Sequence, residues 1–203
     1  MKILFTSILL LLGFLFLSAQ DGLLQDYLSK EFHKNRREAL RQKMPANSVA
    51  VFFANPIRNR SNDLDYVYHQ DSNFYYLTGY REPHAGLVIF SENKTDSIGH
   101  TYNEKLYVQE RNAEREQWNG RRLGVEGAKK ELGFDKAYNG IEFLNSEIDF
   151  KSFDKVMHFD FNNDYRDTRH SADLFDLIQS FKTQIALVND YKKENKTNYI
   201  EID

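Results

Sequence analysis

Apolar residues recur along the chain with two different spacings, which predict helices alternating with strands. The segment 48–54 (SVAVFFA) is short, apolar and rich in β-branched and aromatic residues, as is typical of a buried strand. At residues 174–181, Leu and Phe or Ile return every three or four positions, which predicts a helix with one apolar face. Because elements of both kinds alternate, the pattern favours a single α/β domain.

The same reasoning assigns the remaining elements, and Gly and Pro help to mark their ends. Pro45 closes the first helix, and Gly133 follows another helix in the manner of a C-cap. The predicted helices are residues 25–44, 112–117, 124–132, 141–150 and 171–181. The predicted strands are residues 48–54, 75–78, 85–90, 105–109 and 155–161, with a turn at 79–84 and polar loops at 55–64 and 92–101.

The first nineteen residues follow a different pattern. Lys2 precedes an apolar run at residues 3–17, and Ser18 and Ala19 are small. This order is typical of a secretory signal peptide, which we expect to be cleaved after Ala19. An uncleaved membrane anchor is the alternative, although the run is shorter than the ~20 residues that span a bilayer. The mature chain is therefore expected to be secreted or periplasmic, with no membrane contact.

Composition narrows the class of protein further. The chain has no cysteine, which excludes a disulfide framework and a lipid-modified cysteine. Its formal net charge is -3 with both signs interspersed, so nucleic acid is not an expected partner. With 16 Phe and 12 Tyr to fill a core, residues 20–189 predict one self-sufficient domain. Residues 190–203 predict a polar linker and the start of another element.

Candidate catalytic chemistry is sparse. The chain contains none of the common hydrolase, phosphate-binding or dinucleotide-binding motifs. His69 near Asp71 is the closest approach to a metal pair. One His and one Asp leave a Zn or Mn site short of ligands, so a hydrogen-bonded loop histidine is the favoured interpretation. We expect no catalytic and no metal-binding residue in this chain.

Two segments combine charged, amide and aromatic side chains densely. Residues 60–83 read RSNDLDYVYHQDSNFYYLTGYREP, and either form a loop that satisfies its own backbone groups or contribute to a site. Residues 118–124 read WNGRRLG. There, Trp118 could wall a pocket for an apolar ring while Arg121 and Arg122 hold carboxylates. Alternatively, Trp118 belongs to the core and the arginines begin a solvated helix.

These segments resemble the signature of the amino-terminal domain of aminopeptidase P. Residues 63–66 (DLDY) and 69–83 (HQDSNFYYLTGYREP) resemble the family pattern D-x-x-Y followed by R-Q-x-S-x-F-x-Y-L-T-G-(F/Y)-x-E-P. Residues 116–124 (EQWNGRRLG) resemble its E-x-W-x-G-R-R-L-G motif. His69 departs from the pattern, which usually has Arg there. The resemblance covers residues 25–185 and implies a creatinase-type mixed sheet flanked by helices.

The resemblance also implies the function of a longer protein. Full-length members of the family join this domain to a pita-bread metallopeptidase domain, which binds two Mn ions and releases an N-terminal residue preceding proline. None of that domain's motifs occurs here, so the chain by itself is expected to be inactive. The expected partners are its own catalytic domain, neighbouring subunits of a homo-oligomer and proline-containing peptides.

Two residues carry over from the family as substrate-pocket candidates that act on a neighbouring subunit. The resemblance implies that Trp118 forms a wall of the proline-side pocket. It also implies that Asp63 lies near the same active site. The other matched positions are assigned to structure: Tyr66, Ser72, Phe74, Tyr76, Thr78, Gly79, Glu82 and Pro83. Two alternatives stay open, namely the amino-terminal domain of a prolidase and a free-standing binding or assembly module.

Overall fold

A computed structural model of the protein describes residues 28–146, 148–161, 166, 170–186 and 199–201. The expected signal peptide at residues 1–19 lies outside these residues, as does most of the expected linker at 190–203. In the part of the chain that the structure describes, no helix combines the length and the apolar character needed to span a bilayer. The predicted signal peptide and domain bounds therefore stay predictions.

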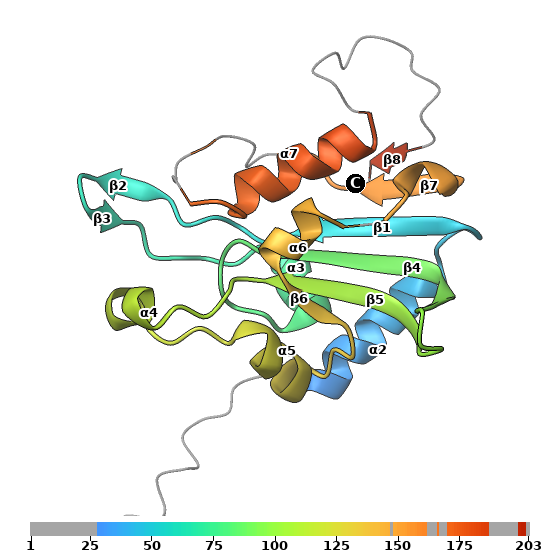
Figure 1. Cartoon of the computed structure of the whole chain (residues 1–203), viewed down its shortest axis with the longest axis horizontal. Coiled ribbons are helices and arrows are strands. Elements are labelled where there is room, and N and C mark those ends of the chain that lie inside the picture. The colour runs from blue at the N-terminus through green and yellow to red at the C-terminus, as the bar shows by residue number, and fades with distance from the viewer. Residues whose placement is uncertain (1–27, 147, 162–165, 167–169, 187–198, 202–203) are drawn as a thin grey trace, which may run out of the picture.

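A six-stranded mixed sheet forms the centre of the described chain, in the order β6-β5-β4-β1-β7-β8 (Figure 1). Its strands are β1 (Ser48–Phe53), β4 (Gly86–Thr95), β5 (Thr101–Val108), β6 (Ala137–Asn139), β7 (Lys155–His158) and β8 (Tyr199–Glu201). β4 is antiparallel to β1 and β5, whereas the outer pairs β1–β7, β5–β6 and β7–β8 are parallel. The predicted α/β fold with a mixed sheet is confirmed.

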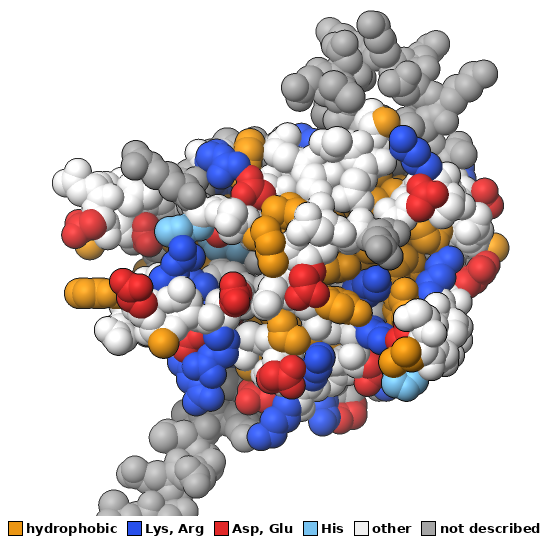
Figure 2. Space-filling model, in the orientation of Figure 1, with side chains coloured by type: hydrophobic (Ala, Val, Ile, Leu, Met, Phe, Trp, Pro, Cys, Tyr) orange, Lys and Arg blue, Asp and Glu red, His pale blue; other side chains and the backbone are white. Residues whose placement is uncertain are grey.

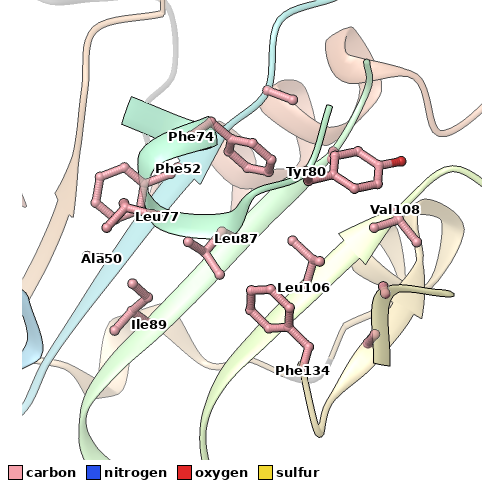
Figure 3. Close-up of a cluster of buried hydrophobic side chains, with 14 of the residues drawn as sticks. Ala50, Phe52, Phe74, Leu77, Tyr80, Leu87, Ile89, Leu106, Val108 and Phe134 are labelled. Carbon is pink, nitrogen blue, oxygen red and sulfur yellow. The ribbon is translucent and has the colours of Figure 1, made fainter. Parts of the chain in front are cut away.

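Helices cover both faces of this sheet. They are α2 (Lys30–Arg41), α3 (Ser72–Thr78), α4 (Ala113–Asn119), α5 (Gly124–Leu132), α6 (Gly140–Leu144) and α7 (Leu174–Gln184), with a 3-10 turn, η2, at Phe150–Ser152. Because side chains alternate along a strand, the central strands supply two cores. One core contains side chains of β1, β4 and β5 against α3, α5 and Phe134 (Figure 3). The other lies under α6, α7 and η2.

One charged side chain, that of Arg37, is buried beside the first of these two cores. Arg37 of α2 is 2% exposed. Its Nε and Nη2 donate to the carboxylate of Glu104 at 2.7 and 2.9 Å, and its Nη1 donates to the carbonyl of Leu77 at 2.8 Å. The guanidinium also lies 4.0 Å from the ring centroid of Phe134. This one side chain therefore connects α2 to β5 and α3.

The predicted strand at residues 75–78 is wrong, because this segment belongs to helix α3. Asp71 caps the helix by accepting from the backbone N–H of Phe74 at 2.7 Å. Gly79 ends it in the left-handed region, with φ 71°. A capping aspartate and a terminal glycine specify a short helix more strongly than two adjacent tyrosines specify a strand.

Other boundaries differ because long-range pairing, not local pattern, sets them. The segment 92–101, predicted as a loop, is a loop only at residues 96–100: β4 runs to Thr95 and β5 begins at Thr101. These extensions are mostly exposed and pair with each other, so they lack the apolar alternation that marks a strand in sequence. The predicted helix at 141–150 shortens to α6 followed by η2, and β6 was not predicted.

Candidate functional site

Two projections extend beyond the same end of the sheet (Figure 1). The first is a small hairpin of β2 (Asn59–Ser61) and β3 (Leu64–Asp65), which are antiparallel. The second is α4. Asp63 lies in the hairpin turn and is exposed, and Trp118 lies near the end of α4. The structure therefore places the two sequence-predicted pocket residues on separate projections at one end of the molecule.

Trp118 is 86% exposed, and α4 contains no buried residue. The alternative in which Trp118 belongs to the core is wrong. The hairpin and the chain that follows it are also apolar at the surface: Leu64 and Tyr66 are 61% and 59% exposed, and Val67 is 97% exposed. We call Leu64, Tyr66, Val67 and Trp118 the apolar tips. Figure 2 shows hydrophobic side chains at this projecting end, beside charged and polar groups.

Behind the hairpin, Gln70 fixes the dense polar segment. Its Oε1 accepts from the backbone N–H groups of Asn55 and Asp71 at 3.0 and 2.8 Å. Its Nε2 donates to the carbonyls of Tyr80 and Glu82 at 3.2 and 2.9 Å. One amide side chain thus satisfies four backbone groups, so this motif residue holds the base of the hairpin against the turn after α3.

His69 and Asp71 both make contacts with nearby backbone groups. Asp71 is the N-cap of α3, and the Nδ1 of His69 lies 3.0 Å from the carbonyl of Gln70 at an exposed position. Among the residues that the structure describes, no group of three or more His, Asp or Glu side chains gathers at a spacing suited to a metal ion. The interpretation of His69 as a hydrogen-bonded loop residue fits this geometry.

Glu82 connects the two sequence motifs. Its Oε1 accepts from the backbone N–H of Leu123 at 2.5 Å, and its Oε2 accepts from the hydroxyl of Tyr80 at 2.9 Å. Burial raises the pKa of Glu82, against the opposing effect of these two hydrogen bonds and of the nearby Arg122. A half-buried carboxyl is therefore shared between the first motif and the segment that follows Trp118.

The start of α4 is held by a second carboxylate. Glu116 receives two hydrogen bonds from the guanidinium of Arg111, at 3.0 and 2.7 Å, and one from the backbone N–H of Asn112 at 3.1 Å. The hydrogen bond from Arg111 is the main reason that the pKa of Glu116 is lowered. Asn112 caps α4 by accepting from the N–H of Arg115 at 3.0 Å. This exposed helix is therefore fixed at its first turn.

A polar cleft of about 450 Å³ lies beside α4. Arg115, Arg122, Asn139, His170 and Asp173 are among the residues that line it. The Nη2 of Arg115 lies 2.8 Å from the Nδ1 of His170, and burial and both arginines lower the pKa of His170. Arg122 donates to the carbonyl of Glu110 at 2.9 Å, so part of its binding capacity serves the backbone rather than a carboxylate.

Reasoning from sequence assigned Glu82 to structure and gave no individual role to Gln70, Arg111 or Glu116, although three of the four stand inside the recognised motifs. Gln70, Glu82 and Glu116 bind backbone groups of the site through their side chains, and Arg111 donates to the carboxylate of Glu116. The sequence signals were the unusual density of polar groups at residues 60–83 and 118–124 and the match of residues 116–124 to the family motif. The partners themselves follow from the tertiary fold.

The fold and the site together define a class of protein: a mixed α/β domain that presents a hairpin and a short helix from one end of its sheet. The chain belongs to the family of the aminopeptidase P N-terminal domain, whose family model matches residues 33–149. The resemblance drawn from the two motifs is thereby confirmed.

Known proteins of this family are longer than the chain. Xaa-Pro aminopeptidase 3 of Dictyostelium discoideum is 44% identical over 110 residues, which are 54% of this chain but 20% of that protein. Xaa-Pro aminopeptidase of Escherichia coli is 39% identical over 110 residues, or 54% of this chain and 24% of that protein. The chain thus spans about a quarter or less of these relatives.

Solved structures agree with the sequence relatives. Aminopeptidase PepP of Pseudomonas aeruginosa has a TM-score of 0.65 at 27% identity, covering 87% of this chain and 37% of that one. Aminopeptidase P of Escherichia coli with the inhibitor Pro-Leu has a TM-score of 0.62 at 28% identity, covering 86% and 37%. The predicted aminopeptidase P-type fold is confirmed by both.

Proposed function

We propose that this chain is the amino-terminal part of a secreted Xaa-Pro aminopeptidase, where it restricts substrate access and supports a homo-oligomer. The observation that carries the proposal is Trp118: a large ring, 86% exposed, on a helix anchored by Glu116. Exposed apolar groups that are held in place are suited to contact another molecule. Asp63 and the remaining apolar tips project from the same end of the sheet.

In this proposal the chain binds and orients, and chemistry takes place elsewhere. Trp118 would pack its ring against the pyrrolidine of a proline in the second position of a peptide, across a subunit contact. Asp63 would approach the same neighbouring active site from the hairpin. Two Mn ions in a catalytic domain would activate water and polarise the scissile carbonyl. The described residues of this chain do not fit as their ligands, because no suitable cluster of side chains gathers there.

Export of the chain remains part of the proposal and rests on residues 1–19 alone. The basic Lys2, the apolar run and Ala19 support a cleaved signal peptide. Amino-terminal sequencing of the mature protein recovered from the periplasm or medium tests it. A mature chain that begins at Gln20 is the expected result, and a retained Met1 in a cytosolic fraction contradicts export.

The enzyme proposal is tested first on the gene. We expect the reading frame to continue beyond Asp203 into a domain with Asp, His and Glu metal-ligand motifs. The purified product should release the first residue of Xaa-Pro-Xaa peptides with Mn, whereas residues 20–203 alone should not. A preference for Xaa-Pro dipeptides would instead assign the chain to a prolidase. A stop codon directly after Asp203 would favour the free-standing module, whose partner would meet the apolar tips.

A further inference from the structure

We infer that Glu82 is a positioning residue. Its carboxylate caps the start of helix α5, although Glu82 is distant in sequence, and thereby fixes helix α4, which carries Trp118. Its importance for substrate binding rests on the proposed function. The positioning itself follows from geometry in this chain and is tested without any catalytic domain.

Helix α5 has no cap of its own. Its N-cap residue is Leu123, which makes no side-chain capping bond. In a capping box, an acidic side chain at the third helical position accepts from the N–H of the N-cap residue. Glu126 occupies that position here, but it is exposed and pairs with Lys129 at 3.4 Å. The N–H of Leu123 is bound instead by Glu82 at 2.5 Å.

A carboxylate suits this place for two reasons. It offers a charged acceptor to a backbone N–H at the start of a helix, which is stronger than a neutral one. It also lies near the positive end of the α5 dipole. The local sequence of α5 lacks an acceptor for the N–H of its N-cap residue. Glu82, 41 residues away, supplies that acceptor.

Glu82 can position Leu123 because it is itself immobilised. Its second oxygen accepts from the hydroxyl of Tyr80, a residue that is 1% exposed. Its backbone carbonyl accepts from the hydroxyl of Tyr68 at 3.2 Å and from the Nε2 of Gln70 at 2.9 Å. Both ends of the residue are thus attached to the first motif. With both carboxylate oxygens bound, Glu82 is suited to holding structure and not to proton transfer.

The constraint reaches Trp118 through a short connection. Five positions separate Trp118 from Leu123, and Arg122 between them donates to the carbonyl of Glu110 at 2.9 Å. The side chain of Arg111 packs closely against Gly124. This glycine has φ 65°, and a Cβ there would lie 2.5 Å from the Cγ of Arg111. Because α4 has no buried residue, its orientation depends on such anchors at its two ends. Glu82 is the anchor after the tryptophan.

The test uses the sole tryptophan of the chain as its own reporter. Glu82→Met keeps the approximate size of the side chain and removes both acceptors. We expect lower anisotropy of the Trp118 fluorescence, and tryptic cleavage after Arg121 or Arg122 that is faster on the order of tenfold, as for loss of one charge-assisted hydrogen bond. Glu82→Gln should loosen the helix less than Glu82→Met does, because its amide oxygen still accepts from Leu123 and its NH₂ group donates to the Tyr80 oxygen, although the charge is lost.

Glu126→Met is the matched control, since it removes a carboxylate from the same helix end without touching Leu123. Both readouts should stay at wild-type values in this variant. Wild-type behaviour of Glu82→Met would overturn the inference, and so would equal loosening in the Gln variant or in the control. The first outcome means that Glu82 anchors nothing, and the others mean that charge alone acts.

A variant that fails to fold does not leave the question open, because amide exchange in the wild-type chain answers it independently. The Leu123 N–H should exchange slowly, near the rate of protected amides in α5. Free exchange at Leu123 would contradict the hydrogen bond to Glu82 and overturn the inference. None of these readouts depends on aminopeptidase activity of the protein. Failure of the proposed aminopeptidase function is therefore distinguishable from failure of the positioning role.

Discussion

Gly79 combines two constraints that only glycine meets. Its φ of 71° lies in the left-handed region, where a side chain is disfavoured by about 1 to 2 kcal/mol. A Cβ at this position would also lie 2.8 Å from the Cδ2 of His33, whose ring is buried. We expect Gly79→Ala to lower the free energy of unfolding by about 2 to 5 kcal/mol in urea titrations, because overpacking adds about 1 to 3 kcal/mol.

Gly99→Ala separates the two contributions. Its φ is 85°, but no atom lies within 4 Å of an added Cβ. This control should cost only the backbone part, about 1 to 2 kcal/mol. Equal losses in the two variants would show that contact with His33 contributes nothing.

Asp96 gives a prediction about acid stability. Its carboxylate accepts from the Nζ of Lys136 at 2.6 Å and from the N–H groups of His100 and Ile98 at 2.8 and 3.1 Å. The hydrogen bond from Lys136 is the largest of the effects that lower the pKa of Asp96 to about 2. Since this pKa is below the unfolded value of 3.8, the stabilisation is complete above pH ~4 to 5 and is lost as the pH falls toward 2.

Thermal melts between pH 5 and 2 measure this effect. Asp96→Asn should flatten the part of the acid-side decline that this carboxylate causes. Lys136→Met should flatten it as well, because the residue chiefly responsible for the lowered pKa is removed. An unchanged slope in both variants would mean that other carboxylates dominate acid unfolding.

At the scale of elements, sequence reasoning succeeded where local pattern and burial agree. β1 and α5 were predicted within about two residues of their observed bounds, because an apolar run and a terminal glycine define them. It failed for α3, where the capping residues Asp71 and Gly79 outweighed strand propensity. Short β2, β3 and β6 depend on pairing partners, which periodicity along one segment cannot reveal.

For the functional site as well, sequence reasoning found what local motifs specify and missed what long-range contacts specify. The two motifs identified the regions that project, including Trp118 and Asp63, because the resemblance names positions directly. They did not reveal that Glu82 reaches Leu123, 41 residues away, since a side-chain hydrogen bond across the fold leaves no spacing signal. His170 joined the cleft beside Arg115 from 55 residues away for the same reason.

The contact between α2 and the sheet provides an element-scale prediction. The side chain of Arg37 is 2% exposed, and that of its partner Glu104 is 17% exposed. Arg37→Met leaves a largely buried carboxylate without its cation, so we expect a loss of about 3 to 5 kcal/mol in unfolding free energy. The double variant Arg37→Met/Glu104→Met removes both charges and should recover most of that loss.

Urea denaturation of the two single variants and the double variant forms the cycle that isolates the pair. A double variant as unstable as Arg37→Met would contradict this expectation. The hydrogen bond to Leu77 and the contact with Phe134 would then account for the stability.

At the scale of the whole molecule, the side chains that pack the cores are distinct from the apolar side chains that are exposed at one end of the sheet. Its buried aromatic side chains fill two cores on opposite faces of the sheet, while the apolar tips gather beyond one end of it. A domain that stabilises itself in this way can expose Trp118 without losing its fold. Substitution at the tips should therefore affect binding and leave stability nearly unchanged, the reverse of the pattern expected for the cores.

Trp118→Ala tests this separation in the full-length product and in the present chain together. The unfolding free energy of the chain should change by less than about 0.5 kcal/mol, as for other exposed positions. In the proposed enzyme, kcat/KM for Xaa-Pro-Xaa peptides should fall about ten- to two-hundredfold, because Trp118 is proposed as one apolar wall of the proline pocket. Ile98→Ala is the control, since Ile98 is 74% exposed in the turn between β4 and β5, at the other end of the sheet (Figure 1). It should leave both measurements unchanged. Unaltered kinetics in Trp118→Ala, or an equal loss in Ile98→Ala, would remove Trp118 from the pocket and leave the exposed ring to a partner of another kind.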